Sequence, residues 1–392
     1  MSLTSTPAAE RVHIAFFGSR NAGKSSVINA LTQQKLSIVS DVPGTTTDPV
    51  YKTMELFPLG PCVIIDTAGM DDEGELGKMR MERTMSVLAK TDIAVLVADA
   101  SRGLQNADRE LLHLISERNL PCIICYNKTD IVPHTPASEN ELSVSALTGD
   151  GIEALRAKLG AMVNDKPVKY ILRDLVASGD TVILVIPIDE SAPKGRLILP
   201  QQQVIRELLE YGCITIAVTD KELPDCIEKY GDSTALVITD SQAFATVGNI
   251  VPPHIPLTSF SILFMRYKGE LETAVRGANV ISDLSDGDRI LISEGCTHHR
   301  QCNDIGSVKI PRLLEKFTGK RLITEYTSGT EFHTDLTGYK LIIHCGACML
   351  NEKEVKNRMK IAQDAGVPFT NYGVAISYMT GILARATEVF KK

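Results

Sequence analysis

The stretch GSRNAGKS at residues 18–25 decides the fold of the first part of this chain. It matches the pattern G-x-x-x-x-G-K-[ST], a glycine-rich loop whose backbone N–H groups wrap the phosphates of a nucleotide. An apolar, strand-like run at residues 12–17 comes before it, and a helical pattern begins at Lys24. Because the loop joins a strand to a helix, the sequence predicts a P-loop domain with a mainly parallel sheet.

The residues of this loop suit a nucleoside triphosphate bound with magnesium. Lys24 is expected to reach the β- and γ-phosphates, and the Ser25 hydroxyl is expected to bind Mg²⁺. The amino-terminal end of the helix adds favourable dipole charge for the phosphates. We predict nucleotide contacts along the whole loop, from Gly18, Asn21, Ala22, Gly23, Lys24, Ser25 and Ser26.

Further motifs follow in a fixed order and point to GTP and GDP. DTAG at residues 66–69 ends the next apolar strand, where Asp66 fits a contact to Mg²⁺ through water and the Gly69 N–H fits the γ-phosphate. NKTD at residues 127–130 ends a later strand. The carboxylate of its last residue, Asp130, can accept hydrogen bonds from both N1–H and the N2 amine of guanine, a donor pair that adenine lacks.

The remaining contacts expected for guanine come from the same region. Asn127 and Lys128 complete the NKTD motif, and Ser145 and Ala146 begin a segment whose backbone can reach the guanine carbonyl. Such a set of motifs in one order is far more specific than a lone glycine-rich loop. The sequence therefore predicts a GTPase that hydrolyses GTP to GDP and phosphate.

This order of motifs resembles translation-factor-type GTPases. The segments NAGKSS at residues 21–26 and PGTTTD at residues 43–48 resemble the branch that includes the tRNA-modification and ribosome-assembly GTPases. The resemblance implies that Asn21 helps to hold a K⁺ ion that replaces an arginine finger, so that hydrolysis is stimulated by potassium. A turn-forming Asn is the alternative interpretation of this residue.

The catalytic residues that this resemblance implies are Lys24, Thr46 and Gly69. The threonine of the first switch lies within residues 45–47, and we favour Thr46 as the second protein ligand of Mg²⁺. Glu73 and Glu75 are candidates for positioning the attacking water, although the polar stretch around them also fits a solvated acidic loop.

The whole chain is expected to be an α/β protein of three domains. A P-loop GTPase domain over residues 1–165 is followed by an α/β dimerisation domain over 166–258 and an α/β cluster-binding domain over 259–392. Pro167 lies in a polar linker, and a proline-rich stretch at residues 251–256 suggests the second boundary. In the first domain the apolar run at residues 93–99 is expected to be a strand. In the two later domains, strand-like runs such as residues 289–293 again alternate with helical runs such as residues 374–389.

Composition narrows the partners and the compartment. The net charge of −7 and the lack of a long basic run give no sign of a nucleic-acid partner. No apolar run approaches the ~20 residues of a membrane span, so no membrane partner and a cytoplasmic location are expected. The nine cysteines should then be reduced, and clustered cysteines are better interpreted as metal ligands than as disulfides.

The cysteines fall into two groups by their local pattern. Cys122 and Cys125 lie within a predicted strand, where residues three apart point to opposite faces, so both are interpreted as core residues. Cys296, Cys345 and Cys348 instead follow predicted strands, at the sheet edge where parallel sheets bind ligands. Three thiolates fit either a zinc ion or an iron–sulfur cluster.

The segments CTH at residues 296–298 and HCGAC at residues 344–348, behind an amino-terminal GTPase, resemble the maturation GTPase of iron–iron hydrogenases. The resemblance covers all three domains. It implies a 4Fe–4S cluster held by Cys296, Cys345 and Cys348. By nearness in sequence, His298 or His344 is a possible fourth ligand. Glu294, His299 and Cys302 are also near in sequence, and spacing alone does not choose among them.

The same resemblance implies partners and a role. The middle domain mediates self-association, and the protein is a scaffold or carrier for a transient di-iron subcluster precursor. It receives this precursor from radical-SAM maturases and passes it to apo iron–iron hydrogenase. The alternative is an RNA- or ribosome-associated GTPase with a structural zinc site, which would be expected to carry a basic accessory domain.

Overall fold

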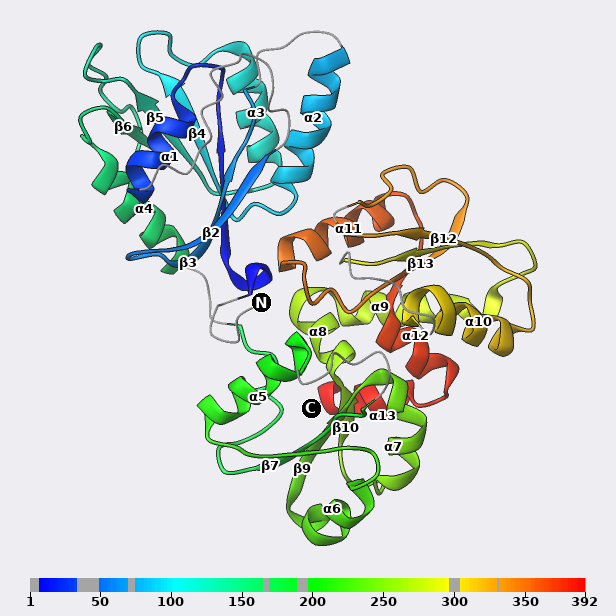
Figure 1. The fold of residues 1–392 in the computed structure, drawn as a ribbon. Helices are drawn as coiled ribbons and strands as arrows, with labels where there is room; N and C mark the ends of the chain where they lie inside the picture. Colours follow the sequence, from blue (N-terminus) through cyan, green and yellow to red (C-terminus); the bar gives the residue numbers. More distant parts are fainter. Residues whose placement is uncertain are drawn as a thin grey trace. The chain divides into compact units, whose positions relative to one another are not determined.

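The computed structural model describes residues 7–33, 49–69, 75–164, 169–188, 197–295, 304–329 and 331–391. The chain divides into two compact units, residues 1–167 and 168–392, and each is described by itself (Figure 1). Among the described residues, no helix is both long and apolar enough to cross a membrane.

The first unit is built on one mixed sheet. Its strands are β1 Val12–Phe17, β2 Val50–Leu56, β3 Gly60–Asp66, β4 Ile93–Asp99, β5 Cys122–Asn127 and β6 Glu141–Ser143. They lie in the order β2-β3-β1-β4-β5-β6, and β2 is antiparallel to β3 while the other neighbouring strands are parallel. β1 and β4 are buried nearly throughout, as parallel strands with both faces covered should be.

Helices cover both faces of this sheet. They are α1 Lys24–Thr32, α2 Glu75–Leu88, α3 Asn106–Glu117 and α4 Ile152–Asn164. Val27 of α1 and Leu155 of α4 pack in the core on one face, and Val87 of α2 and Leu111 of α3 pack in the core on the other. The predicted P-loop architecture is therefore confirmed, with the loop of residues 18–23 between β1 and α1.

The second unit contains two parallel sheets with the same strand order. Their strands are β7 Thr181–Val185, β8 Ile214–Val218, β9 Thr234–Thr239, β10 Leu257–Ser259, β11 Arg289–Ser293, β12 Ile323–Thr327, β13 Tyr339–His344 and β14 Phe369–Asn371. One sheet has the order β8-β7-β9-β10 and the other β12-β11-β13-β14. In each sheet the second strand in sequence is added on one side of the first strand, and the third strand is added on the other side. The strand order therefore reverses between β7 and β9 in one sheet and between β11 and β13 in the other.

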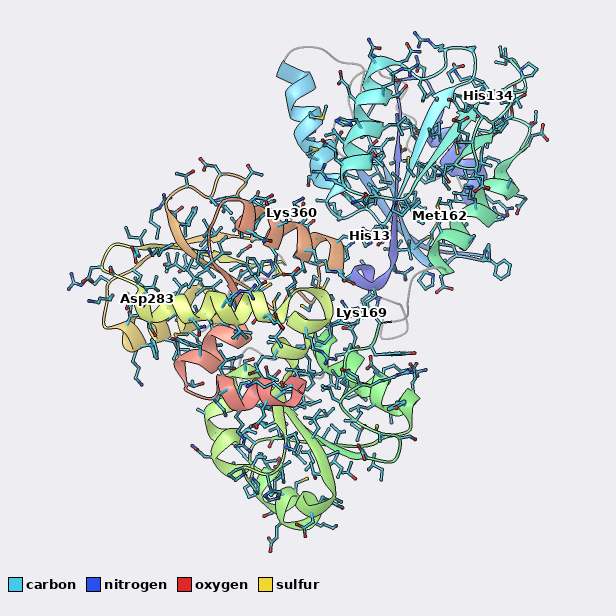
Figure 2. The ribbon with its side chains drawn as sticks, turned by 180° about the vertical axis from the view of Figure 1, so that it is seen from behind. His13, His134, Met162, Lys169, Asp283 and Lys360 are labelled. Carbon is cyan, nitrogen blue, oxygen red and sulfur yellow. The ribbon has the colours of Figure 1, made fainter. Side chains whose placement is uncertain are left out.

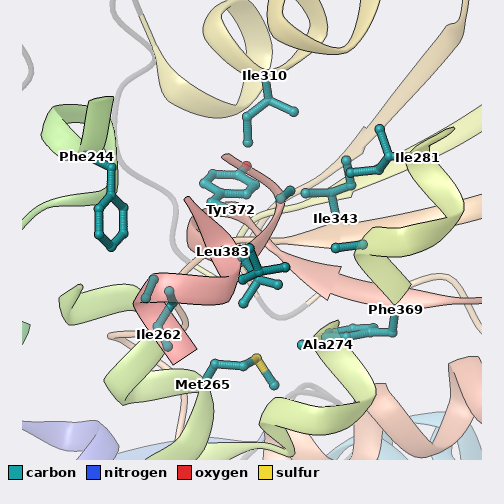
Figure 3. Packing of buried hydrophobic residues seen from close by; sticks show 14 of the residues in the cluster. Phe244, Ile262, Met265, Ala274, Ile281, Ile310, Ile343, Phe369, Tyr372 and Leu383 are labelled. Atoms are coloured by element: carbon teal, nitrogen blue, oxygen red, sulfur yellow. The ribbon is translucent and has the colours of Figure 1, made fainter. Parts of the chain in front are cut away.

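The helices of this unit join both sheets to one hydrophobic core. They are α5 Leu199–Tyr211, α6 Leu223–Tyr230, α7 Phe244–Ile250, α8 Phe260–Lys268, α9 Leu271–Asn279, α10 Ile310–Thr318, α11 Glu352–Asp364, α12 Tyr372–Met379 and α13 Leu383–Glu388. Phe244 beside the first sheet belongs to the same buried cluster as Ile343 and Phe369 of the second (Figure 3). The predicted α/β class, with two further α/β parts after the P-loop domain, is confirmed.

The end of the chain returns to the first of these two sheets. The carbonyl of Ala386 on α13 accepts a hydrogen bond of 2.9 Å from the Thr258 hydroxyl on β10, and Arg385 donates to the carbonyls of Val251 and Pro252. This return explains why residues 168–392 form one compact unit. The boundary proposed at residue 258 falls inside β10.

One predicted helix is wrong in extent. The apolar pattern over residues 374–389 predicted a single helix, but α12 ends at Met379 and α13 begins at Leu383. Gly381 between them has φ of 76°, a left-handed conformation that glycine adopts without strain and that ends a helix.

Candidate functional site

The phosphate-binding loop between β1 and α1 is shaped by its glycines. Gly18 has φ of 142°, and a Cβ atom there would lie 2.1 Å from the carbonyl oxygen of Val97. Gly23 has φ of 90°, and a Cβ atom there would lie 2.2 Å from Asn127 Nδ2. Both positions therefore exclude larger residues, which is the physical reason for the two glycines of the motif.

The charged and polar groups of the loop are already ordered by internal contacts. The Lys24 ammonium is buried and donates a 3.0 Å hydrogen bond to the Gly18 carbonyl, which folds the side chain back over the loop. Asn21 has φ of 63°, a conformation that Asn tolerates better than most residues. The Ser19 hydroxyl donates to Asp108, which also caps the start of α3.

Ser25 and Asp66, the two residues predicted to serve magnesium, lie side by side. The Ser25 hydroxyl donates a 2.8 Å hydrogen bond to Asp66 Oδ2. Burial raises the pKa of Asp66, although the bond from Ser25 and the charge of Lys24 act in the opposite direction. Among the described residues, Asp66 Oδ1 is buried and has no hydrogen-bond partner. An unpaired carboxylate oxygen next to a hydroxyl fits a hydrated divalent cation.

Asn127 connects the phosphate loop to the segment that follows β6. Its Nδ2 donates to the Ala22 carbonyl at 3.0 Å, and its Oδ1 accepts from the Ala146 N–H at 3.0 Å. The NKTD motif predicted Asn127 for the guanine site but gave no sign of this bridging role. No spacing rule signals such a bridge, because its partners are far apart in the chain.

The remaining residues of the predicted guanine site meet at the ends of β4, β5 and β6. The Ser145 hydroxyl donates a 2.6 Å hydrogen bond to Asp130 Oδ1, which orients the carboxylate. Lys128 Nζ lies 2.6 Å from Asp99 Oδ2. Burial alone would raise the pKa of Asp99, but hydrogen bonds from Lys128 and Ser101 lower this pKa to about 2.

The predicted switch residues are only partly described. Thr46 and Glu73 lie outside the described residues, and Glu75 begins α2. Gly69 comes close to the phosphate loop, where a Cβ atom on it would lie 3.1 Å from the Arg20 nitrogen. Ser26 follows Ser25 in the first turn of α1.

The cysteine loop, residues 345–350, follows β13 at the point where the strand order of the last sheet switches. β11 and β13 pair so that Ser293 lies opposite His344. The Gly295 N–H donates to Cys345 Sγ at 3.0 Å, and the Ala347 N–H donates to the same sulfur at 3.4 Å. The segment that leads into Cys296 therefore touches Cys345, and backbone donors already face its sulfur.

Cys345 and Cys348 are both half-buried. Burial raises the pKa of Cys345 to about 11, although the Gly295 N–H acts in the opposite direction. Burial also raises the pKa of Cys348, against the lowering effect of the Lys268 charge. A metal that binds here must therefore displace protons from the sulfurs.

His344 is committed to other contacts. Its Nδ1 lies 2.9 Å from the Cys345 carbonyl and its Nε2 lies 3.1 Å from Arg358 Nη1. Burial and the Arg358 charge lower the pKa of His344 to about 3, so the ring is neutral, with Nδ1 as donor and Nε2 as acceptor. Both ring nitrogens are thus used within the fold.

Arg358 on α11 was not singled out from the sequence, yet it is fully buried beside this loop. It donates to Glu354 Oε1 at 3.1 Å, to the Gly329 carbonyl at 2.8 Å and to Ser293 Oγ at 3.4 Å. A buried arginine is tolerated when its donors are satisfied in this way.

A second unpredicted cluster lies next to Cys345. The hydroxyl of Tyr372 donates to Glu294 Oε1 at 3.3 Å, and a Cβ atom on Gly306 would lie 2.5 Å from the same oxygen. The pKa of Tyr372 lies well above its ordinary value. Burial is the main cause, and the nearby Cys345 and Glu294 add to it. Tyr372 therefore keeps its proton, which it donates to Glu294.

Several predicted metal ligands lie outside the described residues, namely Cys296, His298, His299 and Cys302. Within the described residues, no three His, Cys, Asp or Glu side chains gather in a metal-binding geometry. Of the three cysteines predicted to bind a cluster, the structure describes Cys345 and Cys348.

The cysteines predicted to be core residues pack as expected. Cys125 is buried in the core on one face of the first sheet, and Cys122 packs against the core on the opposite face. Cys62, Cys213 and Cys226 are also buried.

Family comparisons match three parts of the chain. The family described as hydrogen maturase F tetramerization domain matches residues 272–389, and the hydrogen maturase F dimerization domain matches residues 171–269. The family described as 50S ribosome-binding GTPase matches residues 13–128. The two hydrogen maturase F matches together cover more than half of the chain.

Curated relatives are GTPases that share part of their length with this chain. The tRNA modification GTPase MnmE of Nitrosomonas europaea is 35% identical over 156 residues, which is 38% of this chain and 34% of that protein. The GTPase Der of Kosmotoga olearia is 34% identical over 128 residues, which is 31% of this chain and 29% of that protein. The chain thus spans about a third of the length of these relatives.

Solved structures that match include a probable GTP-binding protein engB, with 25% identity, a TM-score of 0.33, and coverage of 40% of this chain and 100% of that chain. Era in complex with MgGDPNP and a segment of 16S ribosomal RNA matches with 19% identity and a TM-score of 0.36, covering 56% of this chain and 98% of that chain.

Proposed function

Because this chain belongs to the hydrogen maturase F family, we propose that it is a GTP-hydrolysing maturation factor that carries a 4Fe–4S cluster. In this proposal it serves as scaffold or carrier for the di-iron subcluster, which it delivers to apo iron–iron hydrogenase. One observation carries the cluster part of the proposal: the Gly295 N–H, directly before Cys296, donates to Cys345 Sγ. That bond joins the two cysteine segments at one point of the sheet edge.

The GTPase part is supported by the match to a GTPase family over residues 13–128. Lys24 would neutralise charge on the β- and γ-phosphates, and the loop N–H groups would hold the phosphate oxygens. Gly69 would contact the γ-phosphate, and Asp130, oriented by Ser145, would select guanine. Asn127, Lys128 and Ala146 would complete the base site.

Magnesium fits the pair formed by Ser25 and Asp66. The Ser25 hydroxyl would bind the ion directly, and the unpaired Oδ1 of Asp66 would accept from a water on it. Thr46 would be the second protein ligand. The ion would supply positive charge where negative charge develops on the transferred phosphoryl group. We also propose that Asn21 helps to hold K⁺ beside the phosphates.

The iron–sulfur cluster fits the donors of the cysteine loop. N–H···S hydrogen bonds to a ligating sulfur, such as those that Cys345 receives, are among the groups that tune a cluster. We propose Cys296, Cys345 and Cys348 as its ligands. For the fourth position we propose His298 rather than His344, because both ring nitrogens of His344 already have partners.

A ligand set of three cysteines and one exchangeable residue leaves a position at which the di-iron precursor can attach. Four cysteines would close the site. The radical-SAM maturases would supply the precursor, and self-association through residues 171–269 and 272–389 would place several carriers in one assembly. The alternative of a ribosome-associated zinc GTPase is not favoured, because the ribosome-binding family matches only residues 13–128.

Transfer to apo-hydrogenase tests this proposal. The protein is produced together with the radical-SAM maturases, purified without oxygen and mixed with apo iron–iron hydrogenase, and hydrogen evolution is measured. Wild-type protein and the control Cys122→Ser should activate the hydrogenase, whereas Cys345→Ser should not. Activation by Cys345→Ser equal to that by wild type would refute the role of the cysteine site.

A further inference from the structure

Lys268, the last residue of α8, places a buried positive charge on the cysteine loop. Its side chain is only 2% exposed. Its ammonium donates to the carbonyl oxygens of Ala347 at 3.2 Å, Cys348 at 3.4 Å and Leu350 at 2.8 Å. A buried ammonium is costly unless its protons are bound, and these carbonyls bind them. The loop therefore folds around a cation that comes from a different part of the chain.

The helix that carries Lys268 is fixed at its other end to the same region. The Ser259 side chain caps α8 by accepting the Ile262 N–H, and the Ser261 carbonyl accepts a 3.0 Å hydrogen bond from Asn371. A Cβ atom on Gly346 would lie 3.8 Å from the Ser261 hydroxyl. Residues 261 and 268 are two helical turns apart and so lie on one face of α8. That face follows the cysteine loop along its length.

The packing of α8 leaves little space for it to shift. A Cβ atom on Gly373 would lie 2.4 Å from Ser261 Cβ, so α8 and α12 are in close contact there. Met265, between these two ends, belongs to the buried core shared by both sheets (Figure 3). The position of the Lys268 ammonium is therefore set by the fold and not by a mobile side chain.

A fixed cation beside thiolate ligands has a definite electrical consequence. A 4Fe–4S cluster becomes more negative on reduction, and a positive charge in a low-dielectric surrounding favours the more negative state. Net charge and hydrogen bonding near the sulfurs are the levers by which a protein sets a cluster's potential. Arg358, a second buried cation near the loop, is paired with the Glu354 carboxylate.

We propose that Lys268 is the positioning residue of the cysteine site, which anchors the loop of residues 345–350 and raises the reduction potential of the cluster bound there. The second half of this proposal rests on the proposed function, and the first half does not. Lys268 precedes Gly269, where the match to the dimerization family ends, while the loop lies in the match to the tetramerization family. The lysine thus links the two matched segments at the metal site.

Redox titration followed by EPR tests the electrical half. The variants are Lys268→Met, which removes the charge, and Lys268→Arg, which keeps it. Lys360→Met, which removes an exposed charge from α11, is the matched control (Figure 2). We expect a more negative cluster potential in Lys268→Met, and a potential near that of wild type in Lys268→Arg and Lys360→Met. Equal potentials in Lys268→Met and wild type, or equal shifts in Lys268→Met and Lys268→Arg, would overturn the electrical role.

Amide hydrogen exchange of the metal-free protein tests the anchoring half without any cluster. Leu350, whose N–H is bonded to the Ala347 carbonyl, is the reporter. Loss of one loop-anchoring interaction should make its exchange about tenfold faster in Lys268→Met, with amides of β11 unchanged. Unchanged exchange at Leu350 would overturn the anchoring role. If wild-type protein takes up no cluster, the proposed function fails, and exchange alone decides the role of Lys268.

Discussion

The phosphate loop after β1 and the cysteine loop after β13 both lie where parallel strands end and the strand order switches. They differ in where their stabilising contacts come from. The phosphate loop is one continuous segment whose glycines adopt left-handed backbone and whose Lys24 is bonded to Gly18 within the same segment. The cysteine loop instead takes its hydrogen bonds from other parts of the chain: Gly295 donates to Cys345, and the buried cation Lys268 of α8 donates to Leu350. A second buried cation, Arg358 of α11, lies 3.1 Å from His344 beside the loop.

The contrast shows how far a short sequence motif can specify a binding site. A phosphate is held by backbone N–H groups and a helix amino terminus, so a short segment can supply nearly all of the cradle. A cluster needs side chains at fixed distances, so its site exists only after distant strands have paired. If the two sites work independently, a change in one site should leave the other unaffected.

Removal of the Lys24 ammonium should strongly impair GTP hydrolysis and leave the cysteine site unaffected. Lys24→Ala should lower the rate of GTP hydrolysis on the order of 10²–10³-fold, because the γ-phosphate loses its main protein charge. The iron content after anaerobic reconstitution should not change. Hydrolysis is measured as phosphate release, and a variant that keeps the wild-type rate would refute the assignment.

Asp130→Asn should change base selection. The amide cannot accept both guanine hydrogen bonds, and the expected loss is on the order of 2–4 kcal/mol in GTP affinity. The variant should instead prefer xanthosine triphosphate, whose pattern at N1 and C2 complements the amide. Competition between the two nucleotides measures this, and a retained preference for GTP would show that Asp130 does not read the base.

Asn127→Ala should destabilise the first unit. It leaves the Ala22 carbonyl and the Ala146 N–H without their partner, at an expected cost of about 1–3 kcal/mol in the free energy of unfolding. Calorimetry of the full chain should show this in the transition of the first unit. Asn140→Ala, at an exposed position, is the control, and equal effects of the two changes would contradict the bridging role.

The position of Asn127 in the structure shows what the sequence could predict and what it could not. The motif predicted that the residue belongs to the nucleotide site, because type and spacing within NKTD are local. Its contacts to Ala22 and Ala146 arise only when β1 and β5 lie in one sheet, and no local pattern encodes them. The same applies to Arg358 and Lys268, which look like ordinary helix residues until the fold buries them.

The fold was predictable to a similar degree. The apolar runs at residues 93–99 and 289–293 predicted β4 and β11 with their observed bounds, because buried parallel strands are continuous hydrophobic segments. β2 was missed because it alternates exposed and partly buried residues at a sheet edge. The identical strand order of the two later sheets was also missed, since it is a property of connections and leaves no repeat in the residues.

The smallest expected effect concerns potassium. If Asn21 helps to hold K⁺, hydrolysis should be several-fold faster in potassium than in matched sodium buffer, and Asn21→Ala should remove most of the difference. The left-handed backbone of Asn21 makes a second variant useful, since Asn21→Gly tolerates that φ but lacks the side-chain oxygen. Equal wild-type rates in the two salts would refute potassium stimulation.

We propose that one chain holds a GTPase site and a separate iron–sulfur site. Iron, sulfide and GTP hydrolysis measured on the same anaerobically reconstituted samples test it most directly, in wild type, Cys345→Ser, Cys348→Ser, Cys296→Ser and the control Cys122→Ser. We predict that wild type and Cys122→Ser hold about four iron and four sulfide per chain, as a 4Fe–4S cluster requires. The other three variants should lose the cluster and its visible absorption while hydrolysis stays near the wild-type rate. A full cluster in those three variants, or zinc alone in wild type made with ample iron, would contradict the account.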